Sequence, residues 1–374
     1  MALIEPFTVY VEQAALDDLR LRLNRARWPT RETVADWSQG VPLAQMRDLC
    51  ETWRTGYDWR RCEARLNALP QSRTIIDGLG IHFIHVRSPR AGALPLLLTH
   101  GWPGSVLEFL DVIGPLSDPP AGAPAFDIVA PSLPGYGFSD TPETTGWGVE
   151  KIAGAWIELM RRLGYSRFVA QGGDWGAAVT TAIAMAQPPE LAAIHLNMPL
   201  VFPEQSDLAD LTSAEQATVA GMSHYQEQDS GYAKLQATRP QTIGYALADS
   251  PVGQAAWIYE KLWAWTDHDG TPESALGRES ILDLTTLYWL TNSGAASAKL
   301  YWESAGAFKG RRLNLPVGVS IFPKEIFRPS RRWAERVYPH LVHWNELKRG
   351  GHFAAWEQPN LFVAELRDCF SNLV

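Results

Sequence analysis

The hydrophobic pattern changes period along the chain, and this change predicts where helices and strands lie. From residue 74 onward, short apolar runs alternate with helix-compatible segments. Residues 74–86 form two strand-like halves around a turn that contains Gly78, which predicts a β-hairpin. Six later runs have the length of buried strands: 94–99, 128–131, 168–171, 193–197, 317–321 and 341–344. Such alternation predicts a mostly parallel sheet with helices on both faces.

Two stretches outside this alternation have a helical character instead. Near the N-terminus, Leu16, Leu19 and Leu23 share one helix face, and a second amphipathic stretch covers residues 43–69. Residues 200–310 are rich in aromatic side chains and contain no clear core strand. Because ligands bind beyond the carboxyl ends of parallel strands, we expect this insertion to cover that end of the sheet. The chain is therefore divided into a helical extension (1–72), an α/β core (73–199 and 311–374) and a helical lid (200–310).

Composition excludes several classes of function. Hydrophobic residues make up 46% of the 374 residues, which is enough for one large catalytic domain with attachments. The formal net charge is −8, and neither basic blocks nor a basic stripe is present, which argues against a nucleic-acid partner or an anionic membrane. A small, neutral substrate fits this charge better.

The cysteines and the N-terminus bear on location. Cys50, Cys62 and Cys369 have unrelated spacings, which supports neither a disulfide framework nor a zinc site. The opening residues MALIEP lack a basic segment and an apolar stretch, and no later run is long enough to span a bilayer. We therefore expect a cytoplasmic protein with no export signal or membrane anchor.

Sixteen tryptophans are many for this length. They include one group within residues 28–59 and another within residues 257–302. Large aromatic surfaces usually serve core or interdomain packing, and this is the simplest interpretation of each of them. Exposed tryptophans on the extension would be compatible with a homodimer.

The string GGDWG at residues 172–176 matches a nucleophile elbow in which Asp174 replaces the usual serine. The apolar run 168–171 before it suits a buried strand, and residues 177–184 after it suit a packed helix. An aspartate here predicts carboxylate attack on an electrophilic carbon rather than acyl transfer through a hydroxyl. The alternative is an aspartate that only caps the following helix.

A second motif, HGWPGS at residues 100–105, directly follows the apolar run 94–99. In this architecture the loop after an early strand supplies an oxyanion hole. The backbone N–H groups of Trp102 and Trp175 are expected to converge on one oxygen. An ordinary glycine and proline turn is the alternative.

A base and an orienting acid follow in the order that this kind of site requires. His352 lies in a late loop, after the last predicted strand and before a C-terminal helix at 360–369, whereas His340 and His343 do not. Glu325 follows the run 317–321 and is predicted to hold the imidazole of His352 in one tautomer. The competitors for the role of acid are Glu346 and Asp283.

Several strings together resemble the epoxide hydrolases of the α/β-hydrolase superfamily, in the microsomal-type branch with an N-terminal helical extension. The strings that carry the resemblance are RARWP at 25–29, YDWR at 57–60, HGWPGS at 100–105, PGYGFS at 134–139, GGDWG at 172–176, RPQTIG at 239–244 and GGHFAA at 350–355. They run through nearly the whole chain. The resemblance implies an α/β-hydrolase fold with a mostly parallel, eight-stranded sheet, the extension and the lid.

The resemblance also implies a mechanism. Tyr232 and Tyr301 match the two lid tyrosines that donate to the epoxide oxygen, although core packing is an alternative for either phenol. Asp174 is expected to form a covalent ester, which water activated by His352 then hydrolyses to a vicinal diol. This cycle uses an epoxide and water, with no metal and no cofactor. Membrane-bound relatives carry an N-terminal anchor, and this chain starts almost at once with the extension.

Two alternative functions remain open from the residues alone. A haloalkane or haloacid dehalogenase uses the same aspartate and histidine, with indole N–H donors for the halide. A non-catalytic binding protein could keep the fold without turnover. Aromatic side chains predict a roomy apolar pocket for a bulky or aryl epoxide, and the candidates for its wall are Phe138, Trp263, Trp302 and Phe353.

Overall fold

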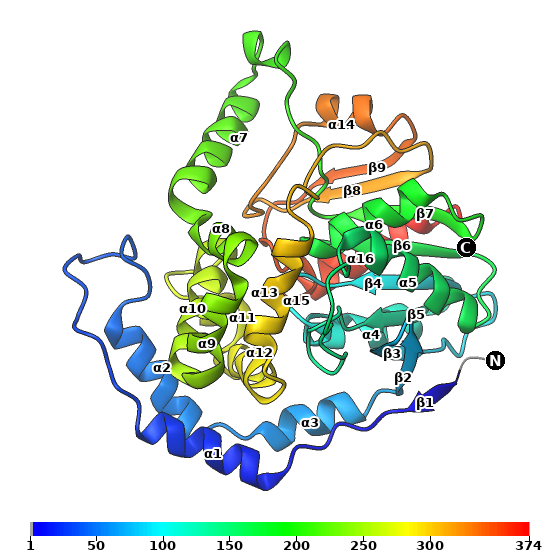
Figure 1. Ribbon diagram of the computed structural model, residues 1–374. Coiled ribbons are helices and arrows are strands. Elements are labelled where there is room, and N and C mark those ends of the chain that lie inside the picture. Colours follow the sequence, from blue (N-terminus) through cyan, green and yellow to red (C-terminus); the bar gives the residue numbers. More distant parts are fainter. Residues whose placement is uncertain (1–2, 374) are drawn as a thin grey trace.

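The computed structural model describes residues 3–373 as a twisted sheet with helices on both faces and a helical lid at one end (Figure 1). Within those residues the sheet has nine strands in the order β1-β2-β3-β5-β4-β6-β7-β8-β9. The strands are β1 (Ile4–Pro6), β2 (Gln71–Ile76), β3 (Leu79–Val86), β4 (Leu94–Thr99), β5 (Phe126–Pro131), β6 (Phe168–Gly172), β7 (Leu191–Leu196), β8 (Val317–Ile321) and β9 (Leu341–Glu346). Strands β1, β2 and β3 are antiparallel to their neighbours, and all pairs from β5 to β9 are parallel.

Eight of these strands, β2 to β9, correspond to the eight predicted from the sequence. The ninth, β1, comes from the extension and pairs with the edge strand β2. Three residues that include a proline have no readable alternation, so the pattern could not reveal β1.

The strands of the parallel part separate two apolar layers. Along β4, Leu97 packs into one hydrophobic cluster, while Leu96 and Leu98 pack into the other, because successive side chains point to opposite faces. Helices α5 and α6 cover the first face, and α4 and α16 cover the second. The helices of the core are η1 (Val106–Phe109), α4 (Leu110–Ser117), α5 (Val149–Arg162), α6 (Trp175–Ala186), α14 (Arg331–Val337), α15 (Ala354–Glu357) and α16 (Pro359–Phe370).

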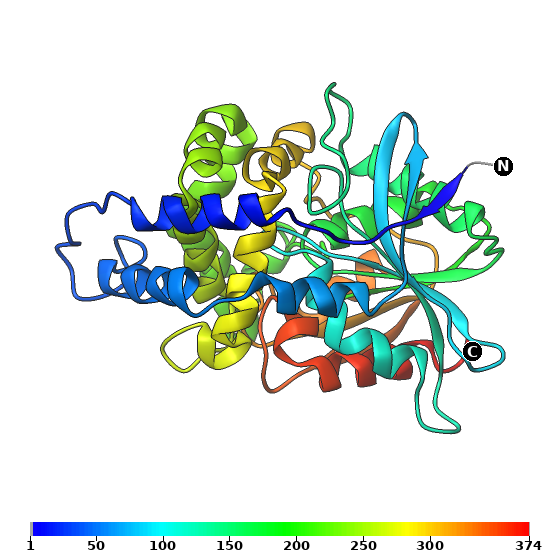
Figure 2. The same ribbon diagram turned by 90° about the horizontal axis from the view of Figure 1, so that it is seen from below.

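The extension wraps along the lid rather than forming a separate body, as Figure 2 shows from below. Its helices are α1 (Gln13–Asn24), α2 (Leu43–Thr55) and α3 (Trp59–Asn67). The indole Nε1 of Trp53 donates to Thr286 Oγ1 at 2.8 Å. The indole of Trp37 stacks on Trp263, with centroids 4.4 Å apart. These extension tryptophans thus serve packing against the lid, and the exposed tryptophan surface considered for a homodimer is not formed by Trp53 or Trp59, each 2% exposed.

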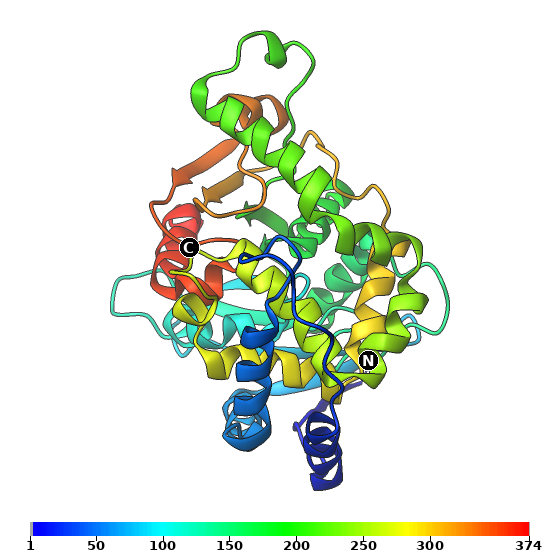
Figure 3. The ribbon, with the colours of Figure 1, turned by 90° about the vertical axis from the view of Figure 1, so that its left-hand side faces the viewer.

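The lid stands over the carboxyl ends of the parallel strands (Figure 3). Its elements are η2 (Asp207–Ala209), α7 (Ser213–His224), the π-helical η3 (Tyr225–Asp229), α8 (Gly231–Thr238), α9 (Pro240–Asp249), α10 (Pro251–Trp265), α11 (Glu273–Leu276), α12 (Arg278–Leu290) and α13 (Ser293–Glu303). The ion pair of Glu215 with Arg332, 2.6 Å long, joins α7 to α14. Within residues 3–373 no helix combines the length and apolarity needed to cross a membrane.

Candidate active site

Asp174 lies on the sharp turn between β6 and α6. Its backbone has φ +51° and ψ −127°, a strained conformation for a residue with a side chain. A Cβ on Gly176 would lie 1.9 Å from the backbone oxygen of Thr99, so only glycine allows this turn to pack under the neighbouring loop. The carboxylate makes no capping hydrogen bond to α6. The geometry is therefore that of an elbow rather than of a simple helix cap.

The backbone of the loop after β4 contacts the Asp174 carboxylate. The N–H of Trp102 donates to Asp174 Oδ1 at 2.7 Å. Gly101 permits this approach, because a Cβ there would lie 2.2 Å from the same oxygen. Burial raises the pKa of Asp174, while His352 and the N–H groups of Trp102 and Trp175 oppose this rise. The Trp102 N–H thus binds the carboxylate, and the Trp175 N–H acts to lower its pKa.

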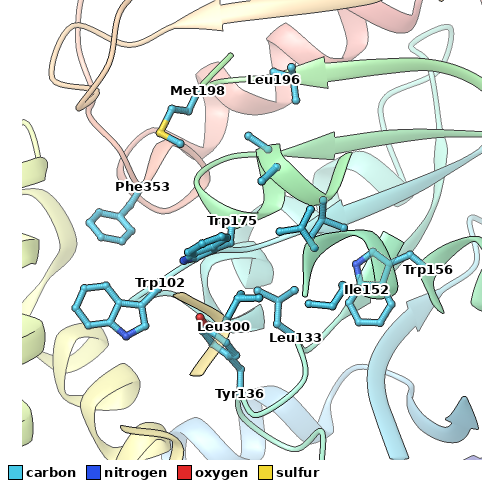
Figure 4. Close-up of a cluster of buried hydrophobic side chains, with 14 of the residues drawn as sticks. Trp102, Leu133, Tyr136, Ile152, Trp156, Trp175, Leu196, Met198, Leu300 and Phe353 are labelled. Carbon is cyan, nitrogen blue, oxygen red and sulfur yellow. The ribbon is translucent and has the colours of Figure 1, made fainter. Parts of the chain in front are cut away.

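Figure 4 shows Trp102, Trp175 and Phe353 on the side of the buried cluster that faces the lid helices. Their rings close the carboxyl end of the sheet beneath the lid. Asp174 and His352 are buried beneath these rings, which strengthens the interactions between their charges.

His352 lies between two carboxylates. Its Nδ1 is 2.6 Å from Glu325 Oε1, and its Nε2 is 3.7 Å from Asp174 Oδ2. Burial alone would lower the pKa of His352, but Glu325 and the other nearby carboxylates outweigh burial and raise the pKa to about 9. Glu325 is fixed in turn by the N–H of Ile326 at 2.8 Å. The imidazole is thus oriented and electrostatically coupled to the elbow.

The competing acids lie elsewhere. Asp283 accepts from Tyr57 at 2.8 Å and from Arg61 at 2.7 Å, so it joins the lid to the extension. Glu346 accepts from the indole of Trp344 at 3.1 Å on the exposed end of β9. Glu325 is the carboxylate that contacts His352.

Two lid tyrosines face this group from above. Tyr232 lies on α8 and stacks on Trp102 with ring centroids 4.9 Å apart. Tyr301 lies on α13 and meets Trp175 edge-on at 4.7 Å. The two phenol rings are 5.9 Å apart, and each side chain is 6% exposed. The Tyr301 hydroxyl has no hydrogen-bond partner among the described residues, whereas Tyr232 Oη pairs with Tyr225 Oη at 3.0 Å.

A cavity of about 490 Å³ opens beside Asp174 and the two tyrosines. Its other walls are mostly apolar and include Met198, Leu200, Phe202, Met222, Phe308 and Phe327. This size and lining are those of a pocket for a small organic molecule. The predicted carboxylate and both phenols thus line the same cavity.

Comparison with known proteins identifies the family. Residues 4–109 match the family model for the epoxide hydrolase N terminus, and residues 95–246 match the model for the alpha/beta hydrolase fold. A Stigmatella aurantiaca protein that is provisionally named an epoxide hydrolase is 60% identical over 99% of this chain and 85% of its own length. The chain belongs to the epoxide hydrolase family.

Two further relatives place this epoxide hydrolase within the family. Epoxide hydrolase 1 of Oryctolagus cuniculus is 35% identical over 97% of this chain and 88% of its own length. The structure of Aspergillus niger epoxide hydrolase superposes with a TM-score of 0.90 at 32% identity, covering 100% of this chain and 97% of that chain. The predicted family and fold are confirmed, and the protein is an epoxide hydrolase.

The structure corrects three of the four residues predicted for the pocket wall. Phe138 packs against Phe7 and His82 near the sheet edge, with ring centroids 5.4 and 5.3 Å away. Trp263 stacks on the extension, and Trp302 is 49% exposed on the outer face of α13. Sequence position in the lid cannot tell the inner face of a helix from its outer face when both are aromatic. None of the three residues lines the 490 Å³ cavity.

Phe353, the fourth predicted wall residue, lines a second and much smaller cavity behind the elbow. This space of about 20 Å³ also contacts Asp174, His352 and Glu108. Glu108 was not predicted from the sequence. It accepts from Ser105 N at 3.2 Å and forms part of the capping box of η1. Burial raises the pKa of Glu108 to about 8, although His352 opposes the rise. The sequence signal that could have revealed Glu108 is its position shortly after the HGWPGS loop.

Proposed function

We propose that this epoxide hydrolase opens its substrate by direct attack of Asp174 on an epoxide carbon, which forms a covalent hydroxyalkyl ester. The observation that carries the proposal is the arrangement around one carboxylate. Asp174 Oδ1 accepts from the Trp102 N–H, Oδ2 faces His352, and two buried phenols lie across the adjoining cavity. An oriented nucleophile, a base and acid donors are the parts that such a reaction needs.

In the first step, an Asp174 oxygen forms a bond to carbon as the ring C–O bond breaks. The electron pair of that bond goes to the ring oxygen, which Tyr232 and Tyr301 stabilise as donors. Burial raises the pKa of both phenols well above the usual value, so they are neutral donors at pH 7. The unpartnered hydroxyl of Tyr301 is free to donate without first breaking another bond.

The second step requires His352 to act as a base. The carboxylate of Asp174 is one of the groups that raise the pKa of His352. Esterification removes this negative charge, so the pKa of His352 falls just when a base is required. His352 then takes a proton from water, and the resulting hydroxide attacks the ester carbonyl. The oxyanion is held by the N–H groups of Trp102 and Trp175, and the diol leaves.

The 20 Å³ cavity is a suitable place for that water. A single water molecule needs about 10 to 15 Å³ of such space and two to four polar partners. His352, Asp174 and Glu108 all contact the cavity. With its raised pKa, Glu108 is largely protonated at pH 7 and can both donate to the water and accept from it.

The large cavity supports a bulky, lipophilic epoxide as the substrate. Its walls include methionine, leucine and phenylalanine side chains, and methionine adapts to irregular apolar shapes. The space of about 490 Å³ accepts an aryl ring or a branched alkyl chain. Aryl and terpenoid epoxides are therefore the first compounds to test.

The ester intermediate is tested by a single turnover of excess enzyme with styrene oxide in water that contains heavy oxygen. We expect the label in the Asp174 carboxylate and an unlabelled diol from the first turnover. Heavy oxygen in that first diol would mean direct attack by water and would sink the proposal. The same incubation with chloroalkanes should release no halide; release of halide without diol formation from styrene oxide would favour a dehalogenase.

The base is tested with His352→Gln, which should accumulate the ester on Asp174 as a mass increase equal to the epoxide. The matched control is His343→Gln, because His343 also pairs with a buried glutamate, at 2.8 Å from Glu365, outside the site. That control should turn over normally. An unmodified His352→Gln protein after incubation would count against the scheme.

A further inference from the structure

A buried lysine lies directly behind one of the two lid tyrosines. Lys261, on α10, is 4% exposed, and its ammonium lies 4.8 Å from the ring centroid of Tyr232 and 5.6 Å from that of Trp265. Lysine is rarely buried unless it is paired, and a desolvated cation over an aromatic face is a strong contact. A buried cation beside the reaction site indicates that Lys261 has a specific role there.

The partners of Lys261 show what it holds. The ammonium donates to the backbone oxygen of Asp229 at 3.1 Å and to its carboxylate at 2.5 Å. Asp229 is the last residue of the π-helical segment η3, three residues before Tyr232. One cation thus fixes both the main chain and the side chain at the point where the backbone turns into α8. The π-helical segment departs from the regular α-helical hydrogen-bond pattern, so contacts from Lys261 help to hold its backbone in place.

Trp265 links Lys261 and Asp229 to the loop that contains His352. Its indole Nε1 donates to Asp229 Oδ2 at 2.8 Å, so the carboxylate is shared between the indole and Lys261. Its backbone oxygen accepts from the N–H of His352 at 2.9 Å. The rings of Trp265 and Tyr232 are 5.2 Å apart. The cluster of Lys261, Asp229 and Trp265 therefore spans from the tyrosine to the histidine loop.

We propose that Lys261 is a positioning residue for Tyr232: through Asp229 it fixes the start of α8 so that the phenol faces the cavity. This inference rests on the proposed function of Tyr232. As the epoxide C–O bond breaks, its electron pair takes the phenolic proton and leaves negative charge on the Tyr232 oxygen. When esterification lowers the pKa of His352, its proton passes to the Tyr232 phenolate. The proton that His352 then takes from water restores the starting state, so the cycle consumes one water and yields one diol.

A neighbouring carboxylate limits the charge of the cluster. Glu260 lies 2.8 Å from the Lys261 ammonium, and burial raises the pKa of Glu260, against the effect of Lys261. The carboxylates of Asp229 and Glu260 therefore both compensate the charge of Lys261, and the cluster acts on Tyr232 through the position of the backbone.

The test is a double-mutant cycle on the rate of ester formation. Lys261→Met, Tyr232→Phe and the double variant are compared in single turnovers with styrene oxide, followed by the fluorescence of the tryptophans at the site. We expect Lys261→Met to slow ester formation at least about tenfold and to leave ester hydrolysis within about twofold. Lys261→Arg should restore most of the rate, because it keeps a cationic donor to Asp229. In the Tyr232→Phe background, Lys261→Met should have almost no further effect.

The controls separate this role from a general loss of stability. Lys151→Met removes a lysine that is paired with Asp77 at the surface, and it should leave both half-reactions unchanged. Thermal unfolding reports whether the Lys261→Met protein is folded, and Lys261→Arg provides the folded alternative if it is not.

Equal slowing of both half-reactions by Lys261→Met, or fully additive effects in the cycle, overturns the inference. Normal ester formation by Tyr232→Phe itself would instead overturn the proposed role of Tyr232. Slow Tyr232→Phe beside normal Lys261→Met would leave that role standing and reject only the inference on Lys261.

Discussion

The hydroxyl of Tyr301 is buried without a partner among the described residues, and this makes it the sharper of the two phenols to test. The hydroxyl faces the cavity, so its removal breaks no hydrogen bond within the described residues. We expect Tyr301→Phe to keep or raise the unfolding free energy while it slows ester formation about 10- to 100-fold. Single-turnover kinetics and denaturant unfolding measure the two effects on the same samples.

Tyr225→Phe is the control for that change. Tyr225 pairs with Tyr232 and also lines the cavity, but its hydroxyl already has a partner. Loss of this hydroxyl should lower the unfolding free energy slightly, so the sign of the stability change differs between the two variants. A large loss of stability in Tyr301→Phe would mean that the hydroxyl has a structural partner.

Glu325 sets the pH range in which His352 is protonated. In the free enzyme the raised pKa of about 9 keeps His352 protonated at pH 7. Glu325→Gln removes the largest of the charges that raise this pKa, so we expect the pKa of His352 to fall. Ester hydrolysis should slow more than ester formation, because a poorly oriented, less basic imidazole activates water weakly; triads of this kind lose up to about 10⁴-fold.

The measurement is the pH dependence of each half-reaction, with the ester followed by mass spectrometry. Glu346→Gln is the matched control at the end of the neighbouring strand and should behave as the native protein. An unchanged pH profile for Glu325→Gln would contradict the assignment of the acid.

Some residues of this site could be predicted from the sequence, and others could not. Asp174, Glu325 and His352 could be predicted because each follows a strand in the order that the architecture requires. Tyr232 and Tyr301 were accessible only through family resemblance, since the lid has many tyrosines at helical spacing. Lys261 and Glu108 were not predicted: their partners are distant along the chain or belong to a common cap, and only packing places them beside the reacting groups.

At the scale of elements, the elbow depends on how closely β4, β6 and α6 approach one another. Gly176→Ala would put a Cβ 1.9 Å from a backbone oxygen of the Thr99 residue, and neither backbone can move without shifting a buried strand. We expect a loss of more than about 3 kcal/mol in unfolding free energy, or failure to fold. Soluble yield and denaturant unfolding provide the measurement.

The matched control is Gly154→Ala in the middle of α5, where no atom lies within 4 Å of the new Cβ. Alanine is the better helix former, so this variant should gain about 0.5 to 1 kcal/mol. A destabilised Gly154→Ala protein would show that the space beside α5 is needed for another purpose.

The elements themselves were predictable to different degrees. The runs 94–99 and 317–321 coincide with β4 and β8, because a fully buried strand is a continuous apolar run with clear ends. The single amphipathic stretch 43–69 proved to be two helices, α2 and α3, which break at Gly56 to Asp58. In the lid, aromatic residues cover several faces of each helix, so the pattern gave helical character without boundaries or an inner face.

Besides His352, three histidines among residues 3–373 are buried: His82, His100 and His195. Burial lowers their pKa values to about 3, 4 and 3. In the unfolded chain the value is about 6.5. The unfolded state therefore binds more protons below pH 6.5, and stability present above that pH is lost as the pH falls towards 4.

We expect the unfolding free energy to drop by about 1.4 kcal/mol per pH unit for each such histidine between pH 6.5 and 4. His195→Gln should reduce this slope by the share of one histidine, and denaturant titrations across pH 4 to 8 measure it. The same slope in the native protein and in His195→Gln would contradict the burial of a neutral imidazole.

The lid is held on its two sides by different forces. The aromatic stack of Trp37 on Trp263 secures it to the extension, whereas the ion pairs of Arg332 with Glu215 and of Arg336 with Asp207 secure α7 and η2 to α14. The two arginine side chains are 42% and 36% exposed, so dissolved salt screens them, while it leaves aromatic stacking intact or strengthens it. We therefore expect concentrated sodium chloride to weaken the contacts on the α7 side of the lid, so that bulky epoxides enter faster while the entry of small ones is unchanged.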